Sequence, residues 1–409
     1  MKGYYCRFCG ELLTQSFVDL GMSPLSNSYI KPDLAHAKES FYPLHVHVCE
    51  HCYLVQLEEF ETPDNIFQDY AYFSSYSESW LQHAERYVNK MTSEYQINRN
   101  SLVVEIASND GYLLQYFNKN EVPVLGIEPA KNVSKVAIDK GIPTITEFFG
   151  KNLALQLREQ GRQADLVLGN NVLAHVPSVN DFVAGMKVLL KSSGIITLEF
   201  PHLLKLIEQI QFDTIYHEHF SYFSLTTVDK IFRAHGLRVF DVEEITTHGG
   251  SLRVYAKHEG DNRPIKHSVQ ELLIREESAG LLNIETYAKF GEQVKRVKRE
   301  LLTCLIQVKD EGKSIVGYGA PAKGNTLLNY CGIARDFIEY TVDRNPYKQG
   351  TLLPGTHIPI YDPAQIKLTR PDYVLILPWN LKEEIMDQLS FIRNWSGKFI
   401  IPIPNVLVV

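Results

Sequence analysis

The sequence predicts an α/β protein of two or three domains, built around a doubly wound parallel sheet. Short apolar strands alternate with amphipathic helical patterns between about residues 100 and 200, and a second alternation begins after residue 312. Ahead of both, four cysteines lie within the first 52 residues. A chain of 409 residues, of which 44% are hydrophobic and 22% charged, is too long for one ordinary core and too apolar to be disordered.

The N-terminal segment, residues 1–68, is expected to fold around a metal ion. It is too short to build a deep core, and its cysteines form two C-x2-C pairs with 39 residues between them. Two thiolates about three residues apart can reach one ion and two such pairs complete a tetrahedron, which favours zinc, although the separation is longer than in small zinc ribbons. Four thiolates leave no position for water, so the zinc is expected to be structural. The expected ligands are Cys6, Cys9, Cys49 and Cys52.

The remaining cysteines and the nearby histidines are expected outside this site. Cys304 and Cys331 are expected to be reduced, partly buried thiols, and His45, His47 and His51 to lie outside the coordination sphere. The N-terminus lacks the apolar run of a signal peptide, and no stretch supplies the roughly 18 apolar residues of a membrane span, so a cytoplasmic protein is expected. A net charge of −7 gives no general attraction to nucleic acid or to an anionic membrane.

Residues 69–261 are expected to form the central doubly wound domain. A helical pattern over residues 76–95 comes first, and helical stretches such as VNDFVAGMKVLLKSS then separate apolar runs. These runs are SLVVEIA, VPVLGIEP, PTITEFF, ADLVLGNNV and SGIITLEFP. Such strands predict a parallel sheet covered by helices on both faces.

The first strand of this domain leads into VVEIASNDGYLL, where a cofactor loop is expected. A loop of the form E-x-G-x-G-x-G would carry three glycines, but here Ala107 and Asn109 take the first two positions and only Gly111 matches, following Glu105. Alanine allows a close turn past a ligand, and asparagine tolerates the left-handed backbone region. Because a pyrophosphate needs a glycine-rich approach to the helix N-terminus, a cofactor without phosphates is favoured over NAD.

Two later strand ends add candidate cofactor ligands. Glu128, followed by Pro129, lies 17 residues after Gly111, where a carboxylate can accept hydrogen bonds from both ribose hydroxyls. Asn170 and Asn171 end the fourth strand, where they can hold a polar amino-acid moiety. His175 follows in the same loop, and for it a ligand-facing role and a buried structural role stay equally open.

Residues 262–312 are expected to form a helical connector, and residues 313–409 a second, smaller doubly wound domain. The connector carries apolar residues at three- and four-residue spacing without proline after residue 267. The last segment alternates SIVGYGA, KGNTLLNYC, FIEYTVD, DYVLILPW, LKEEIMDQL and KFIIPIP.

The segment TIYHEHFSYFS, Thr214 to Ser224, admits three interpretations: a metal site, an acid/base centre, or aromatic core that contains histidine. A metal site built on its H-E-H needs a further ligand and an open ion, and on a strand the glutamate would point to the opposite face. A zinc hydrolase is therefore the least favoured interpretation.

The chain resembles the S-adenosylmethionine-dependent C-methyltransferases that act on nucleotide-activated 4-keto deoxysugars. The resemblance spans the whole chain, and several of its motifs are long and unusual. They are the paired C-x2-C knuckles with SPLSNSY between them, EIASNDGYLL, GIEP, NNVLAHV, YHEHFSYFS, HGGSLRVYA and GYGAPAKGNTLLN.

The resemblance implies a three-domain monomer. It has a zinc-binding N-terminal domain, a central S-adenosylmethionine-binding Rossmann-like methyltransferase domain and a C-terminal Rossmann-like domain, with a dTDP- or GDP-linked sugar in the cleft between them. It also implies that Tyr216, Glu218 and His219 act at the sugar together with His175. A tyrosine of DYAYFSSYS would join them, and the candidates are Tyr70, Tyr72 and Tyr76.

The chemistry implied by this family needs a base and an oxyanion donor. A carbon next to a ketone loses a proton to give an enolate, which attacks the methyl group in line. Histidine, with an ordinary pKa of about 6.5, suits the base, and His219 is the first choice, with Glu218 to orient it or stabilise its charge. Tyr216 or His175 would bond the ketone oxygen.

The glycine-rich stretch GYGAPAKGNT is expected to hold the diphosphate of the sugar nucleotide. Backbone N–H groups and one cation at a strand-to-helix turn make an anion site. The residues proposed to bind substrate here are Gly317, Gly319, Lys323 and Asn325, with His248 lining the same cleft as an alternative to a structural role.

Two other functions stay open. Methylation of an amine or hydroxyl on such a sugar would need no carbon acid. A zinc-stabilised protein that binds a nucleotide sugar or a protein partner without catalysis is the other, although the residues expected for the base and the cofactor are all present.

Overall fold

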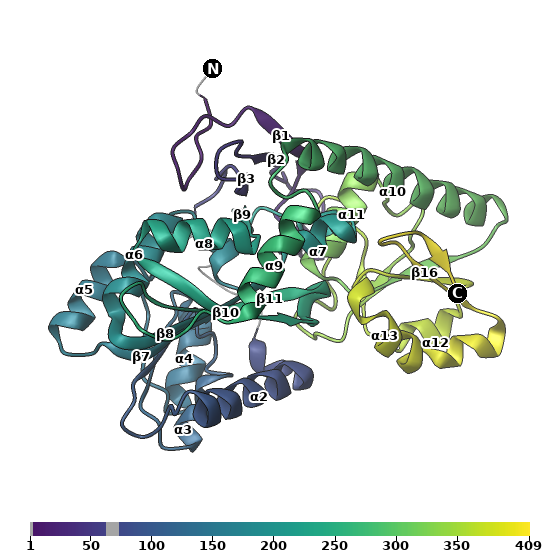
Figure 1. Cartoon of the computed structure of the whole chain (residues 1–409). Coiled ribbons are helices and arrows are strands. Elements are labelled where there is room, and N and C mark those ends of the chain that lie inside the picture. Colours follow the sequence, from purple (N-terminus) through teal and green to yellow (C-terminus); the bar gives the residue numbers. More distant parts are fainter. Residues whose placement is uncertain (1–2, 63–72) are drawn as a thin grey trace. The chain divides into compact units, whose positions relative to one another are not determined.

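The computed structural model describes residues 3–62 and 73–409, which gather into two compact units that interleave in the sequence (Figure 1). The first unit comprises Met1–Thr14, Cys49–Leu203 and Phe220–Leu282, and the second comprises Gln15–Val48, Leu204–His219 and Asn283–Val409. The predicted α/β fold class is confirmed, because each unit holds a mainly parallel sheet with helices packed on it. The predicted domain boundaries, which treat each domain as one continuous segment, remain a prediction.

The first unit is built on a seven-stranded sheet with the order β10-β11-β8-β7-β4-β5-β6. Strands β4 to β8 are parallel, whereas β11 runs antiparallel to both of its neighbours, β8 and β10. The chain moves outward from β4 to β6 and then returns to add β7 beside β4, so the carboxyl ends of β4 and β7 flank the position where such sheets bind ligands. The strands are β4 (Val103–Ile106), β5 (Val124–Ile127), β6 (Thr144–Ile145), β7 (Ala164–Asn170), β8 (Leu190–Pro201), β10 (Leu237–Ile245) and β11 (Ser251–His258).

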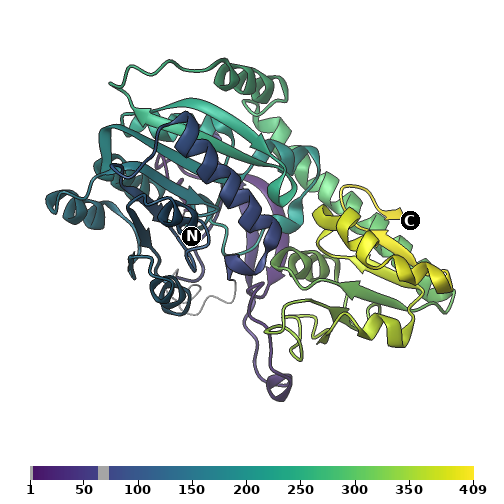
Figure 2. The ribbon, with the colours of Figure 1, turned by 90° about the horizontal axis from the view of Figure 1, so that it is seen from below.

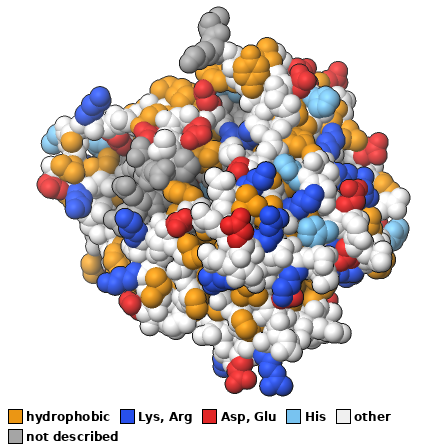
Figure 3. Space-filling view, turned by 90° about the vertical axis from the view of Figure 1, so that its left-hand side faces the viewer, with side chains coloured by type: hydrophobic (Ala, Val, Ile, Leu, Met, Phe, Trp, Pro, Cys, Tyr) orange, Lys and Arg blue, Asp and Glu red, His pale blue; other side chains and the backbone are white. Residues whose placement is uncertain are grey.

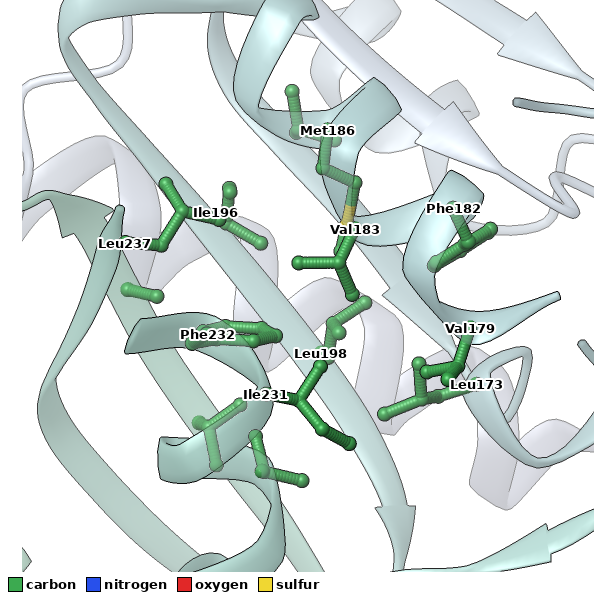
Figure 4. Packing of buried hydrophobic residues seen from close by; sticks show 14 of the residues in the cluster. Leu173, Val179, Phe182, Val183, Met186, Ile196, Leu198, Ile231, Phe232 and Leu237 are labelled. Atoms are coloured by element: carbon green, nitrogen blue, oxygen red, sulfur yellow. The ribbon is translucent and has the colours of Figure 1, made fainter. Parts of the chain in front are cut away.

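Alternating strand residues supply the two faces of this sheet. Val104 and Ile106 pack with α5, α6, α8 and α9, whereas Val103 packs with α2 and α3 on the other face, as the placement of these helices in Figure 1 shows. Figure 4 shows Leu198 of β8 between Val183 of α6 and Ile231 of α8. The helices are α2 (Glu78–Glu94), α3 (Leu114–Lys119), α4 (Lys131–Asp139), α5 (Lys151–Glu159), α6 (Val179–Leu189), α8 (Leu225–Ala234) and α9 (His267–Ser278).

Helix α2 confirms the helix predicted over residues 76–95 and packs on one face of the sheet. The Ser77 hydroxyl accepts from the Trp80 N–H and caps the first turn. Its buried residues recur at three- and four-residue spacing, which turns one face of the helix toward the sheet, as Figure 2 shows. These residues are His83, Ala84, Tyr87, Val88 and Met91.

The second unit holds a six-stranded sheet with the order β14-β13-β12-β15-β16-β17, in which β17 alone is antiparallel to its neighbour within the described residues. Its strands are β12 (Ile315–Tyr318), β13 (Thr341–Val342), β14 (Ile360–Tyr361), β15 (Tyr373–Ile376), β16 (Lys398–Ile401) and β17 (Leu407–Val408). Its helices are α7 (Leu203–Glu208), α10 (Ile284–Asp310), α11 (Ala322–Cys331), α12 (Gln365–Thr369) and α13 (Lys382–Gln388).

The antiparallel hairpin of β1 (Gln15–Ser23) and β2 (Tyr42–Val48) belongs to the second unit. Phe17 of β1 stacks on Phe290 of α10, with ring centroids 4.4 Å apart. The segment predicted as a helical connector contains two helices, α9 and α10, which are assigned to different units, and its role as a connector remains a prediction. In the first unit β3 (Val55–Leu57) pairs with β9 (Ser221–Tyr222).

The surface carries mixed charge. Figure 3 shows Lys and Arg side chains interspersed with Asp and Glu over one face of the molecule, in keeping with the modest net charge of −7. No helix among the described residues is both long enough and apolar enough to span a membrane.

Candidate functional site

Two cysteine knuckles form a tetrahedral thiolate cluster in the first unit. The Sγ atoms of Cys6 and Cys52 lie 3.5 Å apart, as do those of Cys9 and Cys49, and all four lie within 4.8 Å of one another. A tetrahedral zinc with Zn–S bonds of about 2.3 Å needs sulfurs about 3.8 Å apart, so the predicted ligands fit this ion.

Both knuckles have the same backbone geometry. The Gly10 N–H donates to the Cys6 carbonyl and the Tyr53 N–H donates to the Cys49 carbonyl, each at 2.9 Å. Gly10 and Tyr53 both adopt positive φ, which turns the chain back so that both sulfurs of a pair point to one centre. The Gln56 amide donates to Cys6 Sγ at 3.2 Å, and such a bond to a thiolate supports its negative charge.

The histidines near the knuckles lie outside this cluster, as predicted. Among the residues that the structure describes, the four cysteines are the only group of histidine, cysteine and acidic side chains close enough to hold a metal. His45 bonds the Ser16 hydroxyl and His51 is exposed. His217 and His219 of the H-E-H segment belong to no such group, so the metal interpretation of that segment finds no support.

The loop after β4 adopts left-handed backbone at the three positions where a glycine-rich loop would carry glycine. The φ angles are 57° at Ala107, 51° at Asn109 and 77° at Gly111. A side chain at Gly111 would meet Ile142 Cδ1 at 2.3 Å, which explains why glycine is kept there. The loop therefore achieves the turn of a glycine-rich loop with one glycine, and Asn109 also accepts from the Ser74 N–H at 3.0 Å.

Glu128 ties the loop after β4 to the end of β5. One carboxylate oxygen accepts from the Asn109 N–H and the other from the Ala130 N–H, both at 2.9 Å. Burial raises the pKa of Glu128, and these two backbone bonds oppose that rise. Each oxygen keeps a second lone pair, so the predicted contact with ribose hydroxyls remains possible chemically and remains a prediction. Pro129 beside it is half-buried.

Acidic side chains gather below this loop. Glu105 is fully buried, and burial raises its pKa well above the usual range against the lowering effect of a bond with Tyr112, while Glu128 and Asp110 raise it further. Asp110 is 2% exposed and its Oδ2 lies 3.4 Å from Lys140 Nζ. The raised pKa of Glu105 favours its neutral form, and its part in binding a cofactor remains a prediction.

The end of β7 lies beside the rings of Trp80, Tyr112 and His248. Asn170 donates to the Tyr112 hydroxyl at 3.2 Å, and Asn171, with a φ of 54°, lies 3.1 Å from the His248 ring nitrogen. The Trp80 ring stacks near Tyr112 at 5.9 Å and meets the His248 ring edge-on at 5.5 Å. His248 therefore belongs with the predicted cofactor residues of the first unit.

A buried ionic network, which sequence patterns did not reveal, is formed around Glu199 of β8. Glu199 Oε2 lies 2.8 Å from His83 Nε2 and 2.9 Å from Arg253 Nη2, while its Oε1 accepts from the Thr247 hydroxyl. Burial alone would raise the pKa of Glu199, but the bonds from His83 and Arg253 outweigh it and lower the pKa. The network fixes the turn that carries His248. Its only sequence signal was an acidic residue in an apolar strand, LEFP.

His219, in the second unit, is buried and held in one tautomer. Its Nδ1 lies 2.9 Å from the Thr214 carbonyl oxygen. A carbonyl only accepts hydrogen bonds, so the neutral ring carries its proton on Nδ1 and its lone pair on Nε2. The Tyr216 ring lies against it, with centroids 4.1 Å apart. The contact with the Thr214 carbonyl therefore assigns the tautomer of the predicted base, and its catalytic role remains a prediction.

Glu218 and His217 have different surroundings from His219. Asn27 donates to Glu218 Oε1 at 2.6 Å, and burial raises the Glu218 pKa to about 7. His217 Nε2 lies 3.2 Å from the Pro43 carbonyl, and burial lowers its pKa. A contact with the Thr214 backbone orients the His219 ring, and the orienting role predicted for Glu218 stays a prediction.

The glycine-rich stretch after β12 is already well packed. A side chain at Gly317 would meet Thr341 Oγ1 at 2.7 Å, and one at Gly319 would meet Pro378 Cδ at 2.6 Å. The Ala320 N–H donates to Asp343 at 2.7 Å, so a carboxylate occupies part of the expected anion site. These contacts give both glycines a packing role, and their part in binding a diphosphate remains a prediction.

Lys323 and Asn325 make protein contacts at the start of α11. Lys323 Nζ donates to Asn380 Oδ1 at 2.8 Å and lies over the Trp379 ring, while the Trp379 N–H donates to buried Asp213 at 2.7 Å. Burial lowers the Lys323 pKa and the nearby Asp213 charge opposes this. Asn325 is 1% exposed and donates to the Ser26 carbonyl at 2.6 Å.

The remaining predicted residues are His175 and three tyrosines. His175 is half-buried in a 3-10 turn, Leu173–His175, of the first unit, and next to it the Ala174 carbonyl accepts from the Phe220 N–H at 2.7 Å. Tyr76 is 71% exposed. Tyr70 and Tyr72 lie outside the described residues.

Three family models match successive parts of the chain. A zinc binding domain matches residues 6–67, a methyltransferase domain residues 79–242 and a C-methyltransferase C-terminal domain residues 246–404. The C-methyltransferase NovU of Streptomyces niveus is 36% identical over 405 residues, which are 99% of this chain and 96% of that protein.

Two solved structures resemble part of the chain. Magnesium protoporphyrin IX methyltransferase of Synechocystis PCC 6803, solved with bound SAM, is 15% identical with a TM-score of 0.34, covering 43% of this chain and 78% of its own. The PH0226 protein of Pyrococcus horikoshii OT3 is 14% identical with a TM-score of 0.38, covering 49% of this chain and 99% of its own. Both TM-scores lie below 0.5.

The four-cysteine cluster and the cofactor loop agree with the matched models, and the likeness to NovU extends over nearly the whole chain. The protein is an S-adenosylmethionine-dependent methyltransferase with a zinc-binding domain, and it belongs to the C-methyltransferase family.

Proposed function

We propose that the protein methylates a carbon next to the ketone of a nucleotide-linked 4-keto deoxysugar. The observation that carries this proposal is the tautomer of His219, whose Nδ1–H donates to the Thr214 carbonyl, so that the basic lone pair of the neutral ring belongs to Nε2. Carbon methylation requires such a base, because an ordinary sugar carbon is not a nucleophile. Membership of the C-methyltransferase family supports the same chemistry.

Each residue has a role in the proposed reaction. His219 Nε2 takes the proton from the carbon next to the ketone, the C–H electron pair forms the enolate, and Tyr216 or His175 donates a hydrogen bond to the oxyanion. S-adenosylmethionine would supply the methyl group to the enolate carbon, and the electron pair of the broken carbon–sulfur bond would remain on sulfur in the thioether S-adenosylhomocysteine. Glu218 stabilises the protonated His219. The base later returns its proton to solvent.

The cofactor would be held by the first unit. Glu105, Glu128 and Asn109 would bind its polar groups, with Ala107 and Gly111 allowing close approach and Pro129, Asn170 and Asn171 completing the site. The substrate would be a dTDP- or GDP-linked sugar bound by a cytoplasmic monomer. One tyrosine of the set Tyr70, Tyr72 and Tyr76 would reach the sugar, with His248, Gly317, Gly319, Lys323 and Asn325 contributing to the rest of the substrate site.

The experiment measures loss of the proton from the carbon beside the ketone. A panel of 4-keto nucleotide sugars is incubated with the zinc-loaded enzyme in deuterium oxide, with and without labelled S-adenosylmethionine, and the products are analysed by mass spectrometry. Deuterium at the carbon beside the ketone and a label bound to carbon are expected, and both should be lost in His219→Ala.

Other outcomes identify the alternatives. A label on nitrogen or oxygen without deuterium exchange would indicate methylation of an amine or hydroxyl and would overturn the proposal. Failure of the folded, zinc-loaded protein to bind S-adenosylmethionine in calorimetry would instead indicate a binding protein without catalysis.

A further inference from the structure

We propose that Asn27 is a positioning residue of this enzyme, which holds the Glu218 carboxyl group in one orientation beside His219. The inference rests on the proposed function for its catalytic consequence and on geometry within the second unit for the contact itself. Asn27 lies in the SPLSNSY stretch, 191 residues before Glu218, and its role is separate from zinc binding.

The contact joins an exposed amide to a buried acid. Asn27 Nδ2 donates to Glu218 Oε1 at 2.6 Å, and Glu218 is 6% exposed. A hydrogen bond to a buried carboxylate is stronger than one between neutral groups, and losing it leaves the acid poorly solvated. An amide at this position therefore fixes the carboxyl group, whereas a side chain without a donor would release it.

The orientation of the Asn27 amide is itself determined by neighbours. Tyr29 lies 3.4 Å from Asn27 Oδ1 and donates its own proton to the Ala320 carbonyl at 2.6 Å. Above the Glu218 pKa of about 7 the carboxylate accepts hydrogen bonds and does not donate them, so the amide NH2 faces Glu218. Asn27 thus presents its donor to the acid and its oxygen toward Tyr29.

Asn325 supports the loop that carries Asn27. It is 1% exposed, and its Nδ2 donates to the carbonyl of Ser26, the preceding residue, at 2.6 Å. The next residue of α11, Thr326, donates to the Ile215 carbonyl at 2.9 Å, close in sequence to Glu218. The first turn of α11 therefore fixes both loops that the Asn27–Glu218 bond joins.

The titratable groups near the Asn27–Glu218 hydrogen bond are Tyr29, Tyr216 and His219. Tyr29 faces Glu218 from the loop after β1, and burial raises the Tyr29 pKa while Lys348 lowers it and Asp343 raises it. Burial raises the Glu218 pKa to about 7 and the Asn27 bond lowers it. His219 and Tyr216 flank Glu218 on its own segment. Removing the Asn27 donor should shift the Glu218 titration to higher pH.

The test combines stability and catalysis in one mutant cycle of the full-length, zinc-loaded protein. Wild type, Asn27→Ala, Glu218→Ala and the double variant are compared by urea unfolding at pH 8. Asn27→Ala is expected to lower the folding equilibrium constant at least about tenfold in the wild-type background and far less in Glu218→Ala. Equal losses in both backgrounds would overturn the inference.

The catalytic arm uses the 4-keto sugar that the wild type turns over. Asn27→Ala is expected to lower kcat about 10- to 100-fold with an unchanged Kd for S-adenosylmethionine, and to cause no further loss in Glu218→Ala. Ser28→Ala, a change at the next exposed residue, should match the wild type. Full activity of a folded Asn27→Ala would contradict the inference.

The two proposals fail in different ways. If the wild type forms no carbon-methylated product, the proposed function fails, and the stability cycle alone decides whether Asn27 holds Glu218. Asn27→Leu, which keeps about the same size and removes the donor without adding a charge, takes the place of Asn27→Ala in both arms if the alanine variant does not fold.

Discussion

The Thr214 carbonyl oxygen lies 2.9 Å from Nδ1 of His219, and this one backbone contact determines which nitrogen of the ring can act as a base. His217, two residues earlier, makes its contact through Nε2, 3.2 Å from the Pro43 carbonyl, and so presents the opposite nitrogen to a backbone oxygen. Two histidines in one short motif are therefore not equivalent. The difference gives a matched pair of variants.

His219→Asn is expected to lower deuterium exchange into the sugar and kcat by about 100- to 10,000-fold, because it removes the base. The Kd for S-adenosylmethionine should stay within about threefold, since the predicted cofactor residues lie in the first unit. Mass spectrometry measures exchange and calorimetry measures binding. His217→Asn is the control and should retain exchange at a rate near that of the wild type. Equal losses in the two variants would contradict the assignment of His219.

Removal of zinc should destabilise the protein rather than alter its chemistry. Four thiolates close the metal's coordination, so the ion acts as a cross-link between the two knuckles. Cys6→Ser is expected to abolish stoichiometric zinc and to lower Tm by about 5 °C or more, measured by elemental analysis and calorimetry. Cys304→Ser, in α10, should retain one zinc per chain. Full zinc content in Cys6→Ser would exclude the cluster as the metal site.

Two residues of the cofactor loop with positive φ, Ala107 and Gly111, should respond differently to substitution. Gly111→Ala should weaken S-adenosylmethionine binding about tenfold or more, because its methyl group would meet Ile142 Cδ1 at 2.3 Å and its φ of 77° disfavours alanine. Ala107→Gly should bind normally and change the free energy of unfolding by no more than about 1 kcal/mol, since relief of a strained φ offsets the entropy of glycine. Calorimetry with the cofactor checks both. Tight binding by Gly111→Ala would show that the loop does not approach the ligand.

Glu218 should make the stability of the protein depend on pH. Burial raises its folded-state pKa from 4.5 to about 7, so between these values the folded protein binds more protons than the unfolded chain and loses stability as pH rises. Glu218→Gln removes this effect. The free energy of unfolding of the variant relative to the wild type should rise by about 3 kcal/mol from pH 4.5 to pH 8.

Urea unfolding at several pH values measures this difference. Glu300→Gln, on the exposed side of α10, is the matched glutamate-to-glutamine control measured in parallel. A flat difference for Glu218→Gln would mean that the Glu218 carboxyl is not perturbed by its surroundings.

Much of the fold and part of the site followed from local sequence. The C-x2-C spacing led to the cysteine cluster because two thiolates on one turn are neighbours whatever the rest of the chain does. The helix at Glu78–Glu94 followed from the spacing of its apolar residues. Ala107 and Asn109 were identified as glycine substitutes, and both adopt left-handed backbone, because this conformation is a property of single residues in a tight turn.

The tertiary structure decided what the sequence left open, because it depends on contacts between residues far apart in the chain. Glu218 meets Asn27 across 191 residues, and His83 meets Glu199 across 116, and no periodicity records such pairs. Lys323 illustrates the same limit: its position at a helix start predicted an anion site, yet the folded chain places Asn380, Trp379 and Asp213 around its ammonium group. The sequence by itself determined which chemical groups are present and how each turns locally. Only folding decided which partner each buried group meets, since burial makes an unpaired charge or donor costly and so selects its neighbours.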